Sequence, residues 1–254
     1  MTRVVGRTII VSPCCKALYG TPKYASMNFM AYGYWTDGDM EHSLMPTDGG
    51  LRMCQCGTAF LLRDTISLDI DASDEIKAPK YVEFAQLPQI IVTTKSPHVE
   101  VTARRNYWRG LNDEYRVIYR AYRDNEQALE EARWFGDYYA SLPAWQRPAR
   151  RLLKSKPPEN FPKKRRPFSA PPYTPSSEQL DNMAKLLTLI LAGSAAEDWI
   201  DWLEVAELYR EQGMFDEARE MLSRCKDDEQ EGVTWGLISR LVDARTIGPV
   251  RFTV

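Results

Sequence analysis

The sequence predicts an α+β protein, in which a small β-rich module is followed by mostly α-helical regions. Short β-prone runs separated by Gly, Asp and Pro turns occupy residues 1–80. Apolar and aromatic residues recur at helical spacing in residues 81–142 and again in residues 176–254. Prolines and basic residues are concentrated in residues 143–175, which is typical of an extended linker. We therefore expect four successive regions: a β module, a helical middle region, a linker and a helical C-terminal domain.

The β module is expected to contain four short strands. Each run is rich in β-branched or aromatic residues and is bounded by turn residues, which is the pattern of a strand. The runs are Arg7–Val11, Phe29–Trp35, Thr58–Leu62 and Ser67–Ile70. Strands this short predict a small sheet with a small core.

The helical middle region begins with a recognisable start signal. Ser96 suits an N-cap and Pro97 suits the first helical position, so we predict a helix that ends at Gly110. Asn112 can cap the next helical segment, which is rich in tyrosine and ends before Pro143. The middle region is therefore expected to consist of successive helices.

The C-terminal domain is expected to be helical as well. Ser176 or Ser177 can begin a helix that Gly193 can close, and its apolar run is long enough to be buried on most of its surface. A helical hairpin follows, and a last helix is expected near Val233–Arg245.

The helical hairpin carries a family resemblance. Ala206 and Ala218 are small enough to let two helices approach, and Gly213 permits the turn between them. The residues at the relative spacings of a tetratricopeptide repeat are Trp202, Ala206, Tyr209, Gly213, Phe215, Ala218 and Leu222. The hairpin resembles one such repeat, of about 34 residues. Since a second copy and a closing proline are lacking, the resemblance implies a solitary pair packed by flanking helices.

Four of the five cysteines lie in two tight clusters, Cys14-Cys15 and Cys54-Gln55-Cys56. Two pairs of thiolates brought together can hold one tetrahedral zinc ion. The second cluster is followed by Gly57 and resembles half of a zinc ribbon of the rubredoxin-like kind. We therefore predict a zinc site with Cys14, Cys15, Cys54 and Cys56 as ligands.

The cysteine spacing leaves alternatives open. Zinc ribbons usually separate the two cysteines of a pair by two residues, and Ser12 stands where a first ligand would be expected. One alternative is a three-sulfur site completed by His42. Another is that one or two of the four cysteines are only buried apolar residues, as we expect for the lone Cys225.

The sequence shows no recognisable catalytic motif. The chain has only two histidines, which gives little scope for a histidine-based triad or a catalytic zinc site. Phosphate-binding glycine loops and a CxxC redox motif are also missing. We therefore expect a structural zinc ion and a protein that is not an enzyme.

The segment between the two cysteine clusters is rich in aromatic residues and methionine. Such side chains either cover the core of the small module or form a contact surface for a partner. The acidic residues of this segment either form a solvated turn, which is the interpretation we favour, or a small cation or acid/base site. The candidate partner-binding residues are Tyr32, Tyr34, Trp35, Asp37, Asp39 and Glu41.

The chain as a whole is similar to uncharacterised bacterial proteins of one architecture. These proteins join a cysteine ribbon with a YWTDG-type segment, here Tyr34–Gly38, to a C-terminal repeat-like helical pair. The resemblance implies this architecture and no established activity.

Two functions compete. The first is non-catalytic protein binding, and a bacterial toxin is one conceivable partner, which would make the chain an immunity protein. Its net charge of −2 suits a basic partner enzyme. The alternative is nucleic-acid binding by the zinc ribbon together with the basic linker, Arg147–Arg166.

A cytoplasmic location without membrane partners is expected. No apolar run reaches the roughly 18 residues that a spanning helix requires. The apolar stretch near the N-terminus is too short and too poorly flanked for a signal peptide. Reducing conditions in the cytoplasm favour metal binding by the cysteines over disulfide formation.

Overall fold

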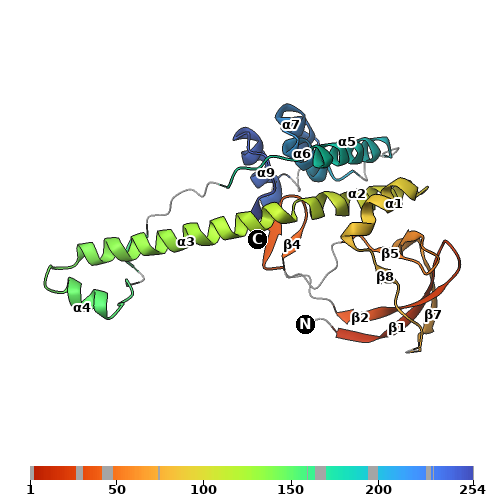
Figure 1. Ribbon diagram of the computed structural model, residues 1–254, viewed down its shortest axis with the longest axis horizontal. Helices are drawn as coiled ribbons and strands as arrows, with labels where there is room; N and C mark the ends of the chain where they lie inside the picture. Colours follow the sequence, from red (N-terminus) through yellow and green to blue (C-terminus); the bar gives the residue numbers. More distant parts are fainter. Residues whose placement is uncertain are drawn as a thin grey trace. The chain divides into compact units, whose positions relative to one another are not determined.

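The computed structural model divides the chain into two compact units (Figure 1). We call Met1–Asn112 together with Thr174–Val254 the body, and Asp113–Tyr173 the arm. The strands and helices confirm the predicted α+β class. The described residues are 3–26, 31–41, 48–73, 75–158, 160–163, 170–193, 200–226, 230 and 232–253.

Three small antiparallel sheets form the β part of the body, among the described residues. Their strand orders are β2 (Leu18–Ser26), β1 (Arg3–Val11), β7 (Ile66–Asp71); β4 (Met40–Glu41), β3 (Gly33–Trp35), β9 (Arg251–Phe252); and β6 (Ala59–Leu61), β5 (Leu51–Met53), β8 (Lys80–Tyr81). The predicted strands at 7–11 and 67–70 are confirmed within β1 and β7, and that at 58–62 is confirmed for the residues of β6, since Leu62 begins a 3₁₀ turn. Part of the predicted strand 29–35 lies outside the described residues, and its end is β3.

Helices α2 and α5 of the body start where the sequence predicts them to start, whereas α1 was not predicted. Ser96 caps α2, since its hydroxyl accepts a hydrogen bond from Val99 N (3.4 Å). Ser176 caps α5 and forms a reciprocal capping box with Gln179. The helices are α1 (Leu87–Thr93), α2 (Pro97–Leu111), α5 (Ser177–Ala192), α6 (Trp202–Glu211), α7 (Phe215–Ser223) and α9 (Val233–Asp243), with short 3₁₀ turns at Leu62–Asp64 and Phe84–Gln86.

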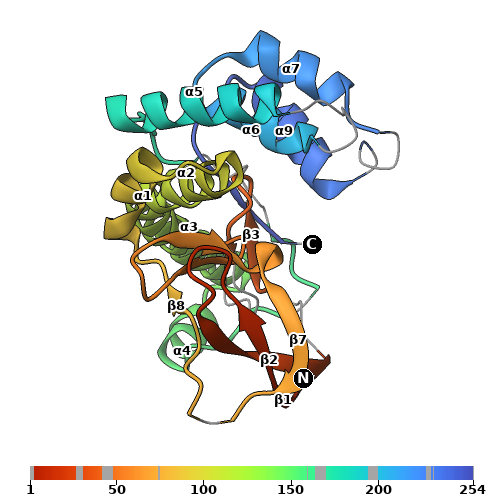
Figure 2. The ribbon, with the colours of Figure 1, turned by 90° about the vertical axis from the view of Figure 1, so that its right-hand side faces the viewer.

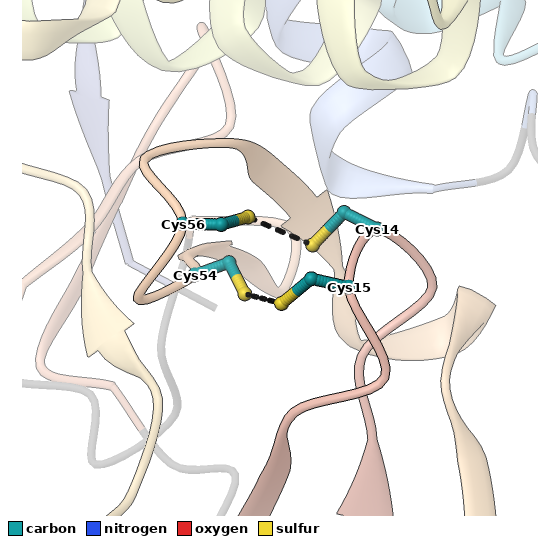
Figure 3. A group of neighbouring side chains, drawn as sticks. All are labelled: Cys14, Cys15, Cys54 and Cys56. Carbon is teal, nitrogen blue, oxygen red and sulfur yellow. Dashed lines mark hydrogen bonds between the residues drawn. The ribbon is translucent and has the colours of Figure 1, made fainter.

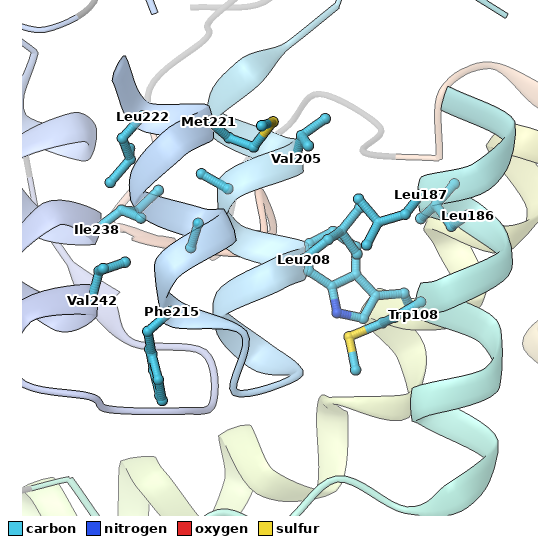
Figure 4. Close-up of a cluster of buried hydrophobic side chains, with 13 residues drawn as sticks. Trp108, Leu186, Leu187, Val205, Leu208, Phe215, Met221, Leu222, Ile238 and Val242 are labelled. Atoms are coloured by element: carbon cyan, nitrogen blue, oxygen red, sulfur yellow. The ribbon is translucent and has the colours of Figure 1, made fainter. Parts of the chain in front are cut away.

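Helix α2 lies between two hydrophobic cores. Ala103 and Tyr107 pack with α1 and with Leu51 and Leu61 of the β part. Trp108, on another side of α2, packs into the core formed by α5, α6, α7 and α9 (Figure 4). Figure 2 accordingly shows β1, β2 and β7 on one side of α2 and the C-terminal helices on the other. The β part and the C-terminal helices therefore share one packed body.

A buried polar network joins α6 to the rest of the body. Arg210 and Glu207 are both fully buried and form a paired contact, with N–O distances of 2.5 and 2.7 Å. The Glu211 carboxylate accepts hydrogen bonds from Trp108 Nε1 (2.9 Å) and Asn112 Nδ2 (3.2 Å). Its other oxygen, Oε1, has no hydrogen-bond partner among the described residues. Burial, reinforced by the negative charge of Glu207, raises the pKa of Glu211 to about 8.

The arm consists of α3 (Asp113–Ser141), α4 (Arg147–Leu152) and a returning segment. Aromatic side chains hold the returning segment on α3: Trp134 Nε1 donates to Phe161 O (3.3 Å), and Tyr138 contacts the Phe161 ring edge-on. Tyr139 OH donates to Ser155 O (3.2 Å). Residues 143–175, expected to be an extended linker, therefore contain a short helix and a packed return.

Within the described residues, no helix combines the length and the apolar character needed to cross a membrane.

Candidate metal centre

The first cysteine cluster lies on a tight turn between β1 and β2. Ser12 N donates to Ala17 O (2.9 Å), and Lys16 N donates back to Ser12 O (3.2 Å). The Ser12 hydroxyl accepts a further hydrogen bond from Ala17 N (3.0 Å). Lys16 has a φ of 60°, a left-handed backbone conformation that residues other than glycine rarely adopt. The turn points Cys14 and Cys15 toward the second cluster (Figure 3).

The second cluster lies on a similar turn between β5 and β6. Cys54 N donates to Thr58 O (3.0 Å), and Gly57 N donates to Cys54 O (2.9 Å). Gly57 has a φ of 82°, which a glycine adopts without strain. Ser12 and Cys54 therefore hold corresponding positions in the two turns, as do Lys16 and Gly57.

The two turns bring four sulfur atoms together. All four Sγ atoms lie within 4.8 Å of one another. Cys15 Sγ is 3.3 Å from Cys54 Sγ, and Cys14 Sγ is 3.5 Å from Cys56 Sγ (Figure 3). Zinc–sulfur bonds of about 2.3 Å in a tetrahedron place the sulfurs about 3.8 Å apart, so small shifts would fit the set around one ion. The four cysteines can hold a metal ion, and each turn contributes two ligands.

Two polar side chains support the sulfurs from behind. The Tyr19 hydroxyl donates to Cys54 Sγ (3.3 Å) and accepts from Gln55 N (2.7 Å). The Ser12 oxygen lies 3.7 Å from Cys54 Sγ and 3.8 Å from Cys15 Sγ. Hydrogen bonds of this kind orient metal ligands and tune their charge. Ser12 could be identified from the ribbon pattern, whereas Tyr19 could not, because a tyrosine in a strand resembles any core residue.

The same contacts control the protonation of the cysteines. Burial alone would raise the pKa of Cys54, but hydrogen bonds from Cys56 N and the Tyr19 hydroxyl lower that pKa to about 6. Contacts with Thr58 lower the pKa of Cys56. Burial, with hydrogen bonds to Cys54 and Cys56, raises the pKa of Cys14 to about 12. Negative charge thus gathers on Cys54 and Cys56, where a metal cation would stabilise it.

The candidate partner-binding residues lie apart from this cluster, on the hairpin of β3 and β4. Trp35 is 1% exposed and donates from Nε1 to Glu41 Oε1 (3.1 Å). Glu41 also pairs with Arg251 of β9 (2.6 Å). Tyr34 is half-buried and packs against Phe252. These side chains hold the hairpin to β9, so Trp35 offers no surface to a partner.

The acidic turn of the hairpin is not the solvated turn that we expected. Asp37 is 2% exposed, because Asn112 Nδ2 donates to its Oδ2 (2.9 Å) and Arg109 Nε donates to its carbonyl (3.0 Å). Asp39 is half-buried, whereas Tyr32 is 77% exposed. Of the six candidate residues, only Tyr32 is mostly exposed to solvent. His42, the alternative fourth ligand, lies outside the described residues.

A pocket of about 570 Å³ lies beside this hairpin. Both arginines in its lining have partners: Arg105 forms a bidentate ion pair with Glu204, and Arg109 Nε donates to the backbone carbonyl of Asp37. Burial lowers the pKa of Arg109, and the charge of Asp37 opposes this effect. The Arg109 contact joins the hairpin to α2, and the Arg105–Glu204 pair joins α2 to α6.

No protein-family model, no curated protein and no solved structure matches this chain. The function is therefore argued from the geometry of the described residues.

Proposed function

We propose that this chain is a non-catalytic protein-binding protein whose four cysteines hold a structural zinc ion. Four sulfur ligands are typical of closed, structural zinc sites, whereas catalytic sites keep a position open for water. The two turns resemble the paired turns of a zinc ribbon, with Ser12 in the place of one usual ligand and Cys14 supplying the sulfur instead.

One observation carries the binding role: an apolar sheet face lies open beside the cysteine turns. Ile66, Leu68 and Ile70 alternate along β7 and therefore share one face, with exposed fractions of 60, 40 and 55%. Leu18 of β2 is 51% exposed and joins this face, because Val11 of β1 pairs with both Leu18 and Ile66. We call these four exposed residues the sheet face. Contiguous apolar surface of this kind marks interaction sites.

The proposed zinc ion supports this face directly. Val11 is the last residue of β1, and Ser12 begins the first cysteine turn. Leu18 is the first residue of β2, directly after that turn. A structural metal supplies folding free energy locally, and here it would hold the end of the sheet at which Leu18 and Ile66 lie.

The acidic charge of the β7 segment favours a basic partner protein, whereas β1 and β2 contribute Arg3, Arg7 and Lys23, of which Lys23 pairs with Asp71 (3.2 Å). Residues 64–76, which include β7, contain five acidic residues and no basic ones. Outside residues 143–175 the chain has 24 basic and 34 acidic residues. Complementary charge accelerates association and excludes partners of the wrong sign. Neutralisation of a basic toxin by a cytoplasmic immunity protein is the form of this role that we propose.

The C-terminal helices serve as packing elements in this proposal. We propose that α6 and α7 form a single tetratricopeptide-like hairpin, in which Ala206 and Ala218 are fully buried at the helix contact. The hairpin packs with α5, α9 and Trp108 in one core. The sheet face, rather than a repeat groove, is therefore the proposed contact surface.

The test compares two double variants in a pull-down from nuclease-treated native extract, with bound proteins identified by mass spectrometry. Leu68→Ser/Ile70→Ser changes the sheet face. Val92→Ser/Val233→Ser changes two apolar residues elsewhere on the body, which are 81 and 53% exposed, and is the control. We expect a basic protein that wild type and control retain equally, and that the sheet-face variant retains at least tenfold more weakly.

Retention of the same protein by the sheet-face variant at wild-type level would overturn the proposed surface. Loss of every partner on nuclease treatment would overturn protein binding itself. Equal zinc content and equal helicity of the variants would show that neither result reflects unfolding.

A further inference from the structure

The tip of the arm carries an amphipathic helical segment. Helical hydrogen bonds run from Gln146 N to Pro143 O (2.9 Å) and continue to Ser155 N, which donates to Arg150 O (3.0 Å). Apolar residues at 145, 148, 149, 152 and 153 repeat at helical spacing. Basic residues at 147, 150, 151 and 154 occupy the positions between them. We call Pro143–Ser155 the tip.

The apolar side of the tip faces solvent, which reverses the usual orientation of a docked helix. Trp145, Leu152 and Leu153 are 79, 86 and 73% exposed. On the basic side, Arg147 contacts the end of α3, since it donates from Nε to Leu142 O and from Nη2 to Ala140 O, both at 2.9 Å, whereas Arg150, Arg151 and Lys154 are exposed. Cationic side chains are stabilised at such a helix C-terminus. These contacts anchor the tip and leave its apolar side uncovered.

The tip is also strongly basic. Residues 143–155 contain four basic residues and no acidic ones, and Lys156 follows directly. Among the described residues, no acidic side chain pairs with Arg150, Arg151, Lys154 or Lys156. The whole of 143–175 carries nine of the 33 basic residues and one of the 35 acidic residues. The tip thus joins an apolar surface to a strong positive potential.

We propose that the tip is a peripheral docking site for an anionic lipid bilayer. Trp145, Leu152 and Leu153 would enter the boundary between headgroups and acyl chains, while the basic residues contact lipid phosphates. A helix with leucine and tryptophan on one side and Lys and Arg on the other is the pattern of such interfacial segments. Basic residues add attraction to an anionic surface. The expectation of no membrane partner, based on spanning and signal segments, does not address this mode of binding.

Nucleic acid explains the tip less completely. Phosphate contacts would use its basic residues, and Trp145 could stack on a base. Leu152 and Leu153, however, gain little from a phosphate backbone, although they are among the most exposed apolar side chains of the arm. The lipid bilayer accounts for the apolar and the basic residues together.

Vesicle co-sedimentation of the full chain tests the proposal. The probes are vesicles of phosphatidylcholine alone and of phosphatidylcholine with an equimolar amount of phosphatidylglycerol. We expect at least tenfold tighter binding to the anionic vesicles. Leu152→Ser/Leu153→Ser should weaken this binding about tenfold. The matched control, Val117→Ser/Ile118→Ser, changes two exposed apolar residues of α3 and should bind like wild type.

Three outcomes would overturn the proposal. The first is equal binding to neutral and anionic vesicles, and the second is wild-type binding by the leucine variant. The third is an absence of vesicle binding while a labelled RNA binds and loses affinity only in Arg150→Ser/Lys154→Ser, which would assign the tip to nucleic acid. Because every substituted side chain is exposed, circular dichroism should show unchanged helicity.

Discussion

The β7 strand of the sheet face and the tip are alike in apolar content and opposite in charge. Each presents three large apolar side chains at the spacing of its own element: Ile66, Leu68 and Ile70 on β7, and Trp145, Leu152 and Leu153 at the tip. Acidic residues accompany the first set, and basic residues accompany the second. Exposed apolar area alone therefore does not indicate the kind of partner. The charge around it separates a basic protein from an anionic lipid surface.

The two surfaces also differ in what holds them. Strands β1 and β2 meet at the first cysteine turn and β7 pairs with β1, so the shape of the sheet face should depend on the proposed zinc ion. The tip depends on hydrogen bonds from Arg147 to the end of α3 and on the contact between Tyr139 and Ser155. The two surfaces should consequently fail under different perturbations.

Loss of the metal should have the largest effect, and it should abolish binding at the sheet face while binding at the tip is kept. Cys56 is exposed, so Cys56→Ser removes a ligand without leaving a cavity. We expect loss of bound zinc and of partner capture, because structural zinc contributes on the order of 10 kcal/mol of binding free energy. Vesicle binding by the tip should stay unchanged. Elemental analysis and the two binding assays measure these outcomes.

Cys225→Ala is the matched control for this change. Cys225 is buried away from the four-sulfur cluster, so this variant should keep its zinc and its partner. Full zinc content in Cys56→Ser would contradict the assignment of the ligands.

A pH effect of intermediate size should appear in the body. The pKa of Glu211 is about 8, above its ordinary value of 4.5, so the folded state holds a proton that the unfolded state releases. Its contribution to stability is complete below pH 4.5 and should be lost as the pH rises through 8, by about 5 kcal/mol at most.

Glu211→Gln removes this ionisable group and tests the effect. Urea unfolding at pH 5 and pH 8 should show a smaller loss of stability in the variant than in wild type. An equal pH dependence in both proteins would show that Glu211 does not titrate in this range. Vesicle binding should not differ between them, since the tip belongs to the arm.

The smallest effects should come from single charges, and they sharpen the comparison. Ile70→Lys and Ile70→Asp remove the same apolar side chain, yet the lysine variant should bind the basic partner roughly tenfold more weakly than the aspartate variant. For Leu153→Glu and Leu153→Lys on anionic vesicles the preference should be reversed, because the glutamate variant should bind roughly tenfold more weakly than the lysine variant. Titrations of all four variants provide the comparison. If the same sign of charge weakened binding at both surfaces, the comparison would be wrong.

Local signals in the sequence predicted the local structure. Ser96 and Ser176 cap the helices expected of them, because capping depends on a few adjacent residues. The paired cysteines indicated a metal site for a similar reason. Each tight turn already holds two of the four ligands, so only the approach of the two turns had to be inferred. The fold class followed from the change of periodicity along the chain.

Contacts between distant residues were not predictable in the same way. Asp37 is buried because Asn112 reaches it from the end of α2, and no local pattern encodes that contact. The pairing of Trp35 with Arg251 joins residues from opposite ends of the chain. The tip was taken for part of an extended linker, because proline and basic residues obscured its helical spacing.

Hydrogen–deuterium exchange before and after zinc removal by a chelator tests the central claim most directly. That claim is that the four cysteines hold a metal ion which keeps the sheet face folded. We predict one zinc ion per chain and, after its removal, faster exchange in residues 3–26 and 51–71, with little change in α5, α6, α7 and α9. Unchanged exchange in β1, β2 and β7 after removal, or an equal increase throughout the body, would contradict the claim.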